Sequence, residues 1–148
     1  MSVAAPLNVL IVEDEAVLAM ELEYAIEDAG HAVAGWATCL SEANDLIKSG
    51  NADLALVDIH LADGITGVEV ADRLSRETGA AVVFMTANAK LIPRDFVGAL
   101  GVISKPYTTG GLQAVLKYLE QGITAPPPSL RQPTGLTLAP DYRDRWSR

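Results

Sequence analysis

Short runs of apolar residues alternate along this chain with longer segments whose apolar residues recur every three or four positions. An apolar run of about four to six residues has the length of a buried strand, and the longer period is that of an amphipathic helix. The pattern therefore predicts strands at residues 7–12, 31–36, 54–58, 80–85 and 101–104. It predicts helices from the first acidic cluster to about Ala29, over 38–50, over 66–78 and over 109–121.

Strands that alternate with helices through short connections predict an α/β domain with a parallel sheet, right-handed crossovers and helices on both faces. Residues 31–36 are less apolar than the other runs, so this strand is expected at an edge. Residues 87–99 contain Pro93, which cannot lie deep inside a helix, so any helix there should be short and begin near it. We expect residues 87–103 to be the mobile part of the domain.

Composition changes after Gly122, which divides the chain into a domain at 1–122 and a proline-rich tail at 123–148. The tail carries four arginines and two aspartates, a net charge of +2 against −10 for the rest, so the two parts attract each other. Apolar residues recur along the tail at Leu130, Leu136, Leu138, Tyr142 and Trp146. We therefore expect the tail to dock on its own domain, or on a second copy in a homodimer; the alternative is a disordered tail with scattered apolar residues.

Charge and composition exclude several classes of function. A net charge of −8 argues against direct nucleic-acid binding, which needs a basic face. Cys39 is the only cysteine, so the chain has no internal disulfide and no cysteine-based zinc site. No apolar run approaches the length of a bilayer span, and the N-terminus lacks the pattern of a signal peptide. We expect a cytoplasmic protein without a membrane partner.

Polar residues that can do chemistry stand at four of the strand ends. Glu13 and Asp14 follow the first strand, Asp58 ends the third, Thr86 follows the fourth and Lys105 follows the fifth. In a parallel sheet these ends meet at one edge, which is where ligands bind in open α/β folds. Each residue alone is typical of a cap or a turn, but their joint placement in this order favours a site.

Clustered carboxylates repel one another unless a cation compensates them. Mg²⁺ prefers oxygen ligands, so Asp14 and Asp58 are candidate carboxylate ligands, and Glu13 is placed to hold a coordinated water. Lys105 supplies a point charge suited to phosphate, and the Thr86 hydroxyl can donate to a phosphoryl oxygen. A carboxylate beside a metal ion, a lysine and a hydroxyl group predicts phosphoryl transfer to Asp58.

Four motifs together resemble the response-regulator receiver domain of two-component signalling. They are Val9-Leu-Ile-Val-Glu-Asp-Glu15, Leu56-Val-Asp58, Thr86-Ala87 and Lys105-Pro106, and the resemblance covers residues 7 to about 121. It implies a flavodoxin-like, doubly wound five-stranded sheet with strand order 2-1-3-4-5. It also implies a stand-alone signalling protein that acts through protein contacts.

The resemblance assigns roles to the residues of the site. It implies that Asp58 accepts a phosphoryl group from a histidine kinase or a phosphotransfer protein. Mg²⁺ would be held by Asp14, Asp58 and the backbone carbonyl of His60, whose side chain we interpret as a solvated loop residue. Thr86 and Lys105 would bind the phosphoryl group, and a cis peptide would join Lys105 to Pro106.

This sequence departs from the family pattern at three places. The loop after Asp58 has Leu61-Ala62 in place of Met-Pro, and Gly67 stands one residue later than usual. Val102 occupies the position of a switching aromatic. Phe84-Met-Thr86 partly resembles the "FAT GUY" stand-alone receivers, which also lack that aromatic, but the Gly and Tyr of their motif are absent.

Two other functions stay open at the level of sequence. A haloacid-dehalogenase-like phosphatase would also use an aspartyl nucleophile, but it requires Asp-x-Asp after the first strand. A degenerate receiver would serve only as an interaction module and would not need the acids, Thr86 and Lys105. For the leading interpretation, a signalling receiver, we expect no DNA-binding or catalytic output domain, since none fits in the remaining residues, and the downstream protein cannot be named from the sequence.

Overall fold

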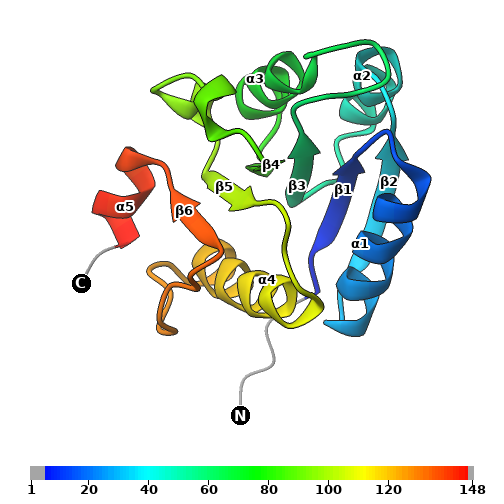
Figure 1. The fold of residues 1–148 in the computed structure, drawn as a ribbon. Coiled ribbons are helices and arrows are strands. Elements are labelled where there is room, and N and C mark those ends of the chain that lie inside the picture. The colour runs from blue at the N-terminus through cyan, green and yellow to red at the C-terminus, as the bar shows by residue number, and fades with distance from the viewer. Residues whose placement is uncertain (1–5, 147–148) are drawn as a thin grey trace.

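Strand β3 (Leu54–Asp58) lies at the centre of the sheet, and all five of its residues are buried. The computed structural model describes residues 6–146. Each strand of this sheet is a short apolar run that pairs with its neighbour through backbone hydrogen bonds (Figure 1). The other strands are β1 (Asn8–Val12), β2 (Ala32–Ala37), β4 (Ala81–Thr86), β5 (Gly101–Ser104) and β6 (Leu136–Leu138).

The sheet order is β2-β1-β3-β4-β5-β6, which confirms the predicted order of the first five strands and the edge position of β2. Strands β1 to β5 are parallel. The five-stranded prediction is incomplete, because β6 adds an antiparallel strand beside β5. This extra strand comes from the segment that sequence analysis set apart as a tail.

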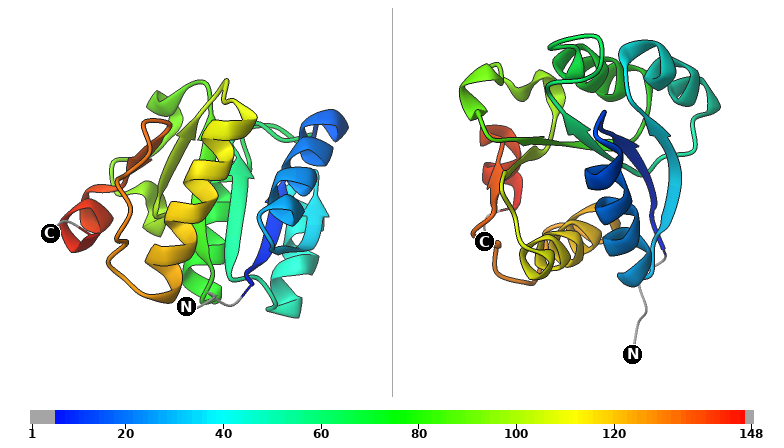
Figure 2. Two further views of the ribbon diagram at one scale, coloured as in Figure 1. Left: turned by 90° about the horizontal axis from the view of Figure 1, so that it is seen from below. Right: turned by 45° about the vertical axis from the view of Figure 1, so that its right-hand side comes forward.

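Two helical layers cover the sheet, one on each face (Figure 1, Figure 2). Helices α1 and α4 pack on the first face, and α2 and α3 pack on the second. Each layer encloses its own apolar core, and the alternating side chains of the central strands contribute to both. The helices are α1 (Ala16–Asp28), α2 (Leu40–Ser49), α3 (Gly67–Glu77), α4 (Thr109–Thr124) and α5 (Pro140–Trp146).

The segment between β4 and β5 differs from the expected short helix near Pro93. Two 3₁₀ helices occupy it, η1 (Ala89–Leu91) and η2 (Phe96–Gly98). Pro93 has no N–H to donate to a helical hydrogen bond, which prevents a longer helix there. Phe96 and Val97 have positive φ angles of 56° and 44°, and such backbone costs a non-glycine residue about 1–3 kcal/mol.

The tail packs against the domain in the same chain. The side chains of Leu136 and Leu138 are buried, and Trp146 is 8% exposed. All three belong to the core cluster that α1 and α4 enclose. In the structure the tail therefore packs on the domain of its own chain. Within residues 6–146, no helix is long and apolar enough to cross a bilayer.

Candidate functional site

Asp58 is the last residue of β3, at the carboxyl edge of the sheet. Pairing with β1 on one side and β4 on the other fixes the backbone of β3, with Asp58 in register with Met85. The Asp58 side chain is only 12% exposed. Its Oδ1 accepts a hydrogen bond from the backbone N–H of His60 at 3.2 Å. The carboxylate is therefore held at a fixed place while one face stays open to solvent.

Lys105 brings a cation into direct contact with Asp58. The Lys105 ammonium lies 2.7 Å from Asp58 Oδ2 and 3.1 Å from Glu13 Oε1. Burial opposes the charge, but the hydrogen bonds and negative charges of Asp58 and Glu13 outweigh it and raise the pKa of Lys105. The Lys105–Pro106 peptide is cis, as the family resemblance implied.

Glu13 is fully buried, which is unusual for a carboxylate. Burial is the main reason that its pKa is raised to about 7, and the nearby charge of Asp58 adds to the rise. A hydrogen bond from the Glu15 backbone N–H and the contact with Lys105 act in the opposite direction. The pKa of Glu13 therefore lies well above that of an ordinary carboxylate.

Asp14 completes a cluster of three carboxylates. Carboxylate oxygens of Glu13, Asp14 and Asp58 lie within 4.8 Å of one another, and Asp14 is exposed. Mg²⁺ binds oxygen ligands at about 2.1 Å, so this spacing fits two or three of them around one ion. The residue types and their geometry therefore fit a small divalent cation.

Thr86 ends β4 beside Asp58 and is buried. Its hydroxyl oxygen accepts a hydrogen bond from the backbone N–H of Asn88 at 3.0 Å. Its backbone carbonyl accepts from the N–H of Lys105 at 3.0 Å. The ends of β4 and β5 are thus joined directly. The structure therefore brings Glu13, Asp14, Asp58 and Lys105 together and places Thr86 at the neighbouring strand end.

The His60 side chain is exposed, and the loop that follows it is ordered by backbone contacts. Leu61 and Gly64 exchange two N–H···O hydrogen bonds, at 2.8 and 3.0 Å, and the Leu61 side chain is buried. The Asp63 carboxylate accepts hydrogen bonds from the Leu40 N–H and the Thr66 hydroxyl. Leu61-Ala62 thus forms an ordered loop without the proline that is common in the family.

Gly67 is a site residue whose role sequence reasoning missed. A Cβ at this position would collide with the backbone carbonyl oxygen of Asp58 and would lie 2.6 Å from the Ile59 Cα. Real Cβ atoms do not approach backbone atoms this closely. The N-terminus of α3 therefore rests directly against the phospho-acceptor candidate. The sequence signal was a glycine at the first position of a helix, where a side chain is normally tolerated.

Trp36 is a second missed residue. It lies at the end of β2, and its indole N–H donates to the backbone carbonyl of Glu13 at 2.6 Å. The side chain is 44% exposed, which agrees with the expected edge position but had suggested no link to the site. The contact makes Trp36 fluorescence a natural reporter of changes at Glu13.

The raised pKa of Glu13 predicts a pH dependence of Mg²⁺ affinity. Below about pH 7 the protonated form of Glu13 dominates, and its negative charge is then lost to the cation and to the coordinated water that Glu13 would hold. Affinity should therefore rise about tenfold between pH 6 and pH 8 and then level off. Titrations followed by Trp36 fluorescence or calorimetry measure this. Glu13→Gln should flatten the profile, and an equally steep profile in that variant would contradict the assignment.

Residues 9–117 match the family described as "Response regulator receiver domain". The match covers more than half of the chain, and the sheet order and strand-end residues agree with it. The chain therefore belongs to the receiver-domain family of response regulators in two-component systems.

Two curated relatives are similar to the receiver part of this chain. One is the phyllosphere-induced regulator PhyR of Methylorubrum extorquens, 34% identical over 111 residues, which are 74% of this chain and 42% of PhyR. The other is the sensory transduction protein LytT of Bacillus cereus, 33% identical over 119 residues, 78% of this chain and 48% of LytT. The chain thus spans about half the length of the curated relatives it matches.

Among solved structures, the receiver domain of PhyR from Erythrobacter litoralis has the same fold. It superposes with a TM-score of 0.72 at 26% identity, covering 85% of this chain and 98% of that one. SdrG from Sphingomonas melonis matches with a TM-score of 0.62 at 28% identity, covering 77% of this chain and 96% of SdrG. These likenesses establish the flavodoxin-like receiver fold.

Proposed function

We propose that the protein is a phospho-accepting receiver in which modification of Asp58 changes contacts with other proteins. One observation carries this proposal: a nearly buried strand-end carboxylate contacts a lysine and lies among two further carboxylates. A carboxylate oxygen of Asp58 would attack phosphorus, the P–N bond of a donor phosphohistidine would break, and an acyl phosphate would form. The donor is a histidine kinase or a phosphotransfer protein.

Mg²⁺ is the cofactor that fits the site. Asp14, Asp58 and the backbone carbonyl of His60 would hold it, and Glu13 would hold a coordinated water. When bound, the ion neutralises charge on the transferring phosphoryl oxygens. The three carboxylates of the cluster support this assignment, since they outnumber the single lysine that compensates them.

Lys105 and Thr86 would bind the phosphoryl group once it is on Asp58. Lys105 already lies 2.7 Å from the accepting carboxylate, so a short movement would bring it to a phosphoryl oxygen. The Thr86 hydroxyl, whose oxygen accepts the Asn88 N–H, would donate its own proton to the phosphoryl group. The hydrogen-bond partners of both residues would therefore change on phosphorylation.

The face of α1 near the site supports docking of the phosphoryl donor. Val17, Met20 and Tyr24 follow one another at helical spacing and are 67–70% exposed. They line a groove of about 680 Å³ whose other wall includes Tyr107, two residues after Lys105. An exposed apolar stripe beside a reactive group is typical of a protein interface. A kinase or phosphotransfer helix with an apolar face would fit it.

Asp58→Asn tests the proposal. A small phosphodonor or a cognate kinase should label the wild-type protein only with Mg²⁺ present, and the variant not at all. Mass spectrometry locates the label. Asp45→Asn, an exposed carboxylate on α2, is the matched control and should be labelled normally. Undiminished labelling of Asp58→Asn, or equal labelling in excess EDTA, would refute the acceptor or the metal respectively.

The position of Asp58 and the identity of residue 60 favour a signalling protein over a phosphatase that hydrolyses phosphoesters. A haloacid-dehalogenase-like phosphatase needs an aspartate two positions after the nucleophile, following its first strand, whereas Asp58 ends the third strand and position 60 is histidine. A degenerate receiver is disfavoured because the carboxylates and Lys105 are all in place.

A further inference from the structure

Residues 125–146 of the tail run along the edge of β5, and we call this segment the strap. Strand β6 pairs antiparallel with β5, with Ile103 opposite Leu136 and Gly101 opposite Leu138. The strap ends in α5, where the Trp146 ring packs edge-on against Tyr118 of α4, with ring centroids 5.7 Å apart. It therefore touches both the sheet and the helix that covers it.

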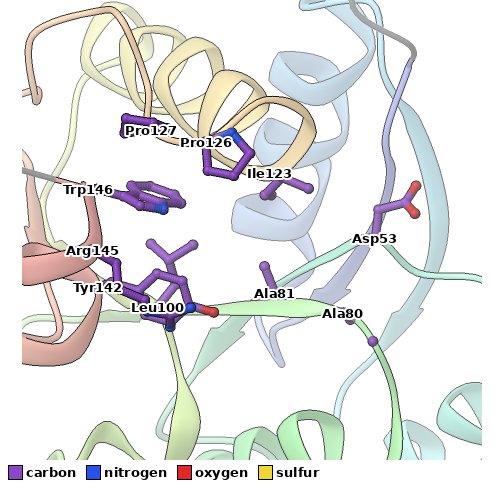
Figure 3. A pocket seen from close by; sticks show the side chains of 12 residues that line it. Asp53, Ala80, Ala81, Leu100, Ile123, Pro126, Pro127, Tyr142, Arg145 and Trp146 are labelled. Atoms are coloured by element: carbon purple, nitrogen blue, oxygen red, sulfur yellow. The ribbon is translucent and has the colours of Figure 1, made fainter.

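Two glycines of the domain allow the strap to approach closely. A Cβ on Gly101 would collide with the Thr137 carbonyl oxygen, and a Cβ on Gly122 would collide with the Trp146 ring. Figure 3 shows Trp146 and Ile123 on opposite sides of a pocket, with Pro126 and Pro127 between them. The close approach of the strap thus depends on the absence of side chains at two positions of the domain itself.

The strap is hydrogen-bonded to both ends of β5, and one of these ends is next to Lys105. At one end the Ser104 N–H donates to the Gly135 carbonyl at 3.1 Å, and Ser104 precedes Lys105. At the other end the Ala139 N–H donates to the Leu100 carbonyl at 2.8 Å. Leu100 directly follows the segment 87–99, and Thr86 directly precedes that segment.

The seam beneath α5 is incompletely filled. A cavity of about 540 Å³ lies between Leu100, Ile123, Tyr142 and Trp146 (Figure 3). A second cavity of about 230 Å³ separates Arg94 and Asp95 of the strained segment from α5. Side chains that border a cavity lose contacts that a filled interior would give. The strap is therefore held mainly by β6 and the Trp146 ring, and its contact with the segment 94–99 is incomplete.

We propose that modification of Asp58 releases the strap from β5; this inference rests on the proposed function. A phosphoryl group on Asp58 draws Lys105 away from Glu13 and pulls on the end of β5 at Ser104. It also draws the Thr86 hydroxyl toward the phosphoryl group and away from the Asn88 N–H, which loosens the segment that carries the strained Phe96 and Val97. The first movement displaces the Ser104 N–H and the second displaces the Leu100 carbonyl, and both groups are hydrogen-bonded to the strap. Release uncovers the β5 edge and its apolar surroundings.

Hydrogen exchange of the 148-residue protein with Mg²⁺ and beryllofluoride, a phosphoryl mimic, tests the strap. Amides of 136–139 and 142–146 should exchange about tenfold faster or more when the mimic is bound, while β2 stays unchanged. Altered exchange at 58–66 reports occupancy of the site itself. If exchange changes at 58–66 but the strap is unchanged or better protected, release of the strap is contradicted and the proposed function stands. No change at 58–66 would overturn the proposed function, and the strap with it.

Gly122→Ala and Gly110→Ala form a matched pair in α4 that tests the docking contact. The first places a methyl group against the Trp146 ring, whereas the second meets open space. Gly122→Ala should give the fast exchange of 142–146 without the mimic, and Gly110→Ala should resemble wild type. Trp146→Ala provides a second route to the same state. Wild-type protection of residues 142–146 in Gly122→Ala would overturn the docking contact, as would wild-type protection of β6 in both variants.

Discussion

Gly67→Ala should destabilise the protein by about 3 kcal/mol or more, a large effect for one methyl group. The new Cβ would occupy the space of the Asp58 carbonyl oxygen, so either α3 or the end of β3 must move. Both carry parts of the buried core, and neither can shift without opening it. Chemical denaturation measures the loss, and labelling of Asp58 by a small phosphodonor should fall in the variant even where it remains folded.

Gly79→Ala is the control for this prediction. Gly79 lies between α3 and β4, and a Cβ there meets no atom within 4 Å. Its unfolding free energy should stay within about 0.5–1 kcal/mol of wild type. Similar unfolding free energies of the two variants would show that the backbone at Asp58 can move at little cost, and would contradict the importance of the close packing at Gly67.

Lys105→Met should tighten Mg²⁺ binding by about tenfold while removing the response to phosphorylation. The ammonium group lies 2.7 and 3.1 Å from two carboxylates, so it competes with a cation for the same negative charge. Without metal the variant should have a lower free energy of unfolding than wild type. Breaking a fully buried ion pair costs about 3–5 kcal/mol, and the loss here should be smaller because the lysine is partly exposed. Added Mg²⁺ should restore much of that loss.

Lys117→Met removes an exposed positive charge from α4 and is the control for net charge. Its Mg²⁺ affinity should match wild type within about twofold, since solvent and salt screen distant surface charges. Calorimetry and thermal denaturation, with and without Mg²⁺, follow both variants. Equal Mg²⁺ affinity of Lys105→Met and wild type would mean that the lysine does not compete for the carboxylates.

The strand ends were predictable because each buried strand is a short apolar run that stops at a polar residue. Val57 followed by Asp58, or Met85 followed by Thr86, marks both the strand and its exit from the sheet. Parallel topology then brings such residues to one edge without any knowledge of side-chain contacts. Sequence reasoning therefore grouped the site residues, although it gave no distances between them.

The missed features all depend on contacts between residues far apart in the chain. Leu136-Thr-Leu138 is too short to predict a strand, and only its partner Gly101–Ile103, more than thirty residues earlier, makes it one. Gly67 is explained by the carbonyl of Asp58, which no local pattern reveals. The segment 87–99 was expected to be weakly helical, but two positive φ angles at Phe96 and Val97 run against the intrinsic preferences of those residues.

The short β6 strand also has a consequence for solubility. A bare β5 edge would present the unpaired backbone groups of Gly101–Ser104, a run without charged side chains, and such edges recruit strands from neighbouring molecules. In the intact chain β6 occupies that edge for three residues, and Pro140 follows closely, so strand pairing cannot extend far along the tail. A chain shortened to the family boundary at residue 117 would lose this cover together with the end of α4. Such a chain should precipitate at concentrations at which the 148-residue protein stays clear.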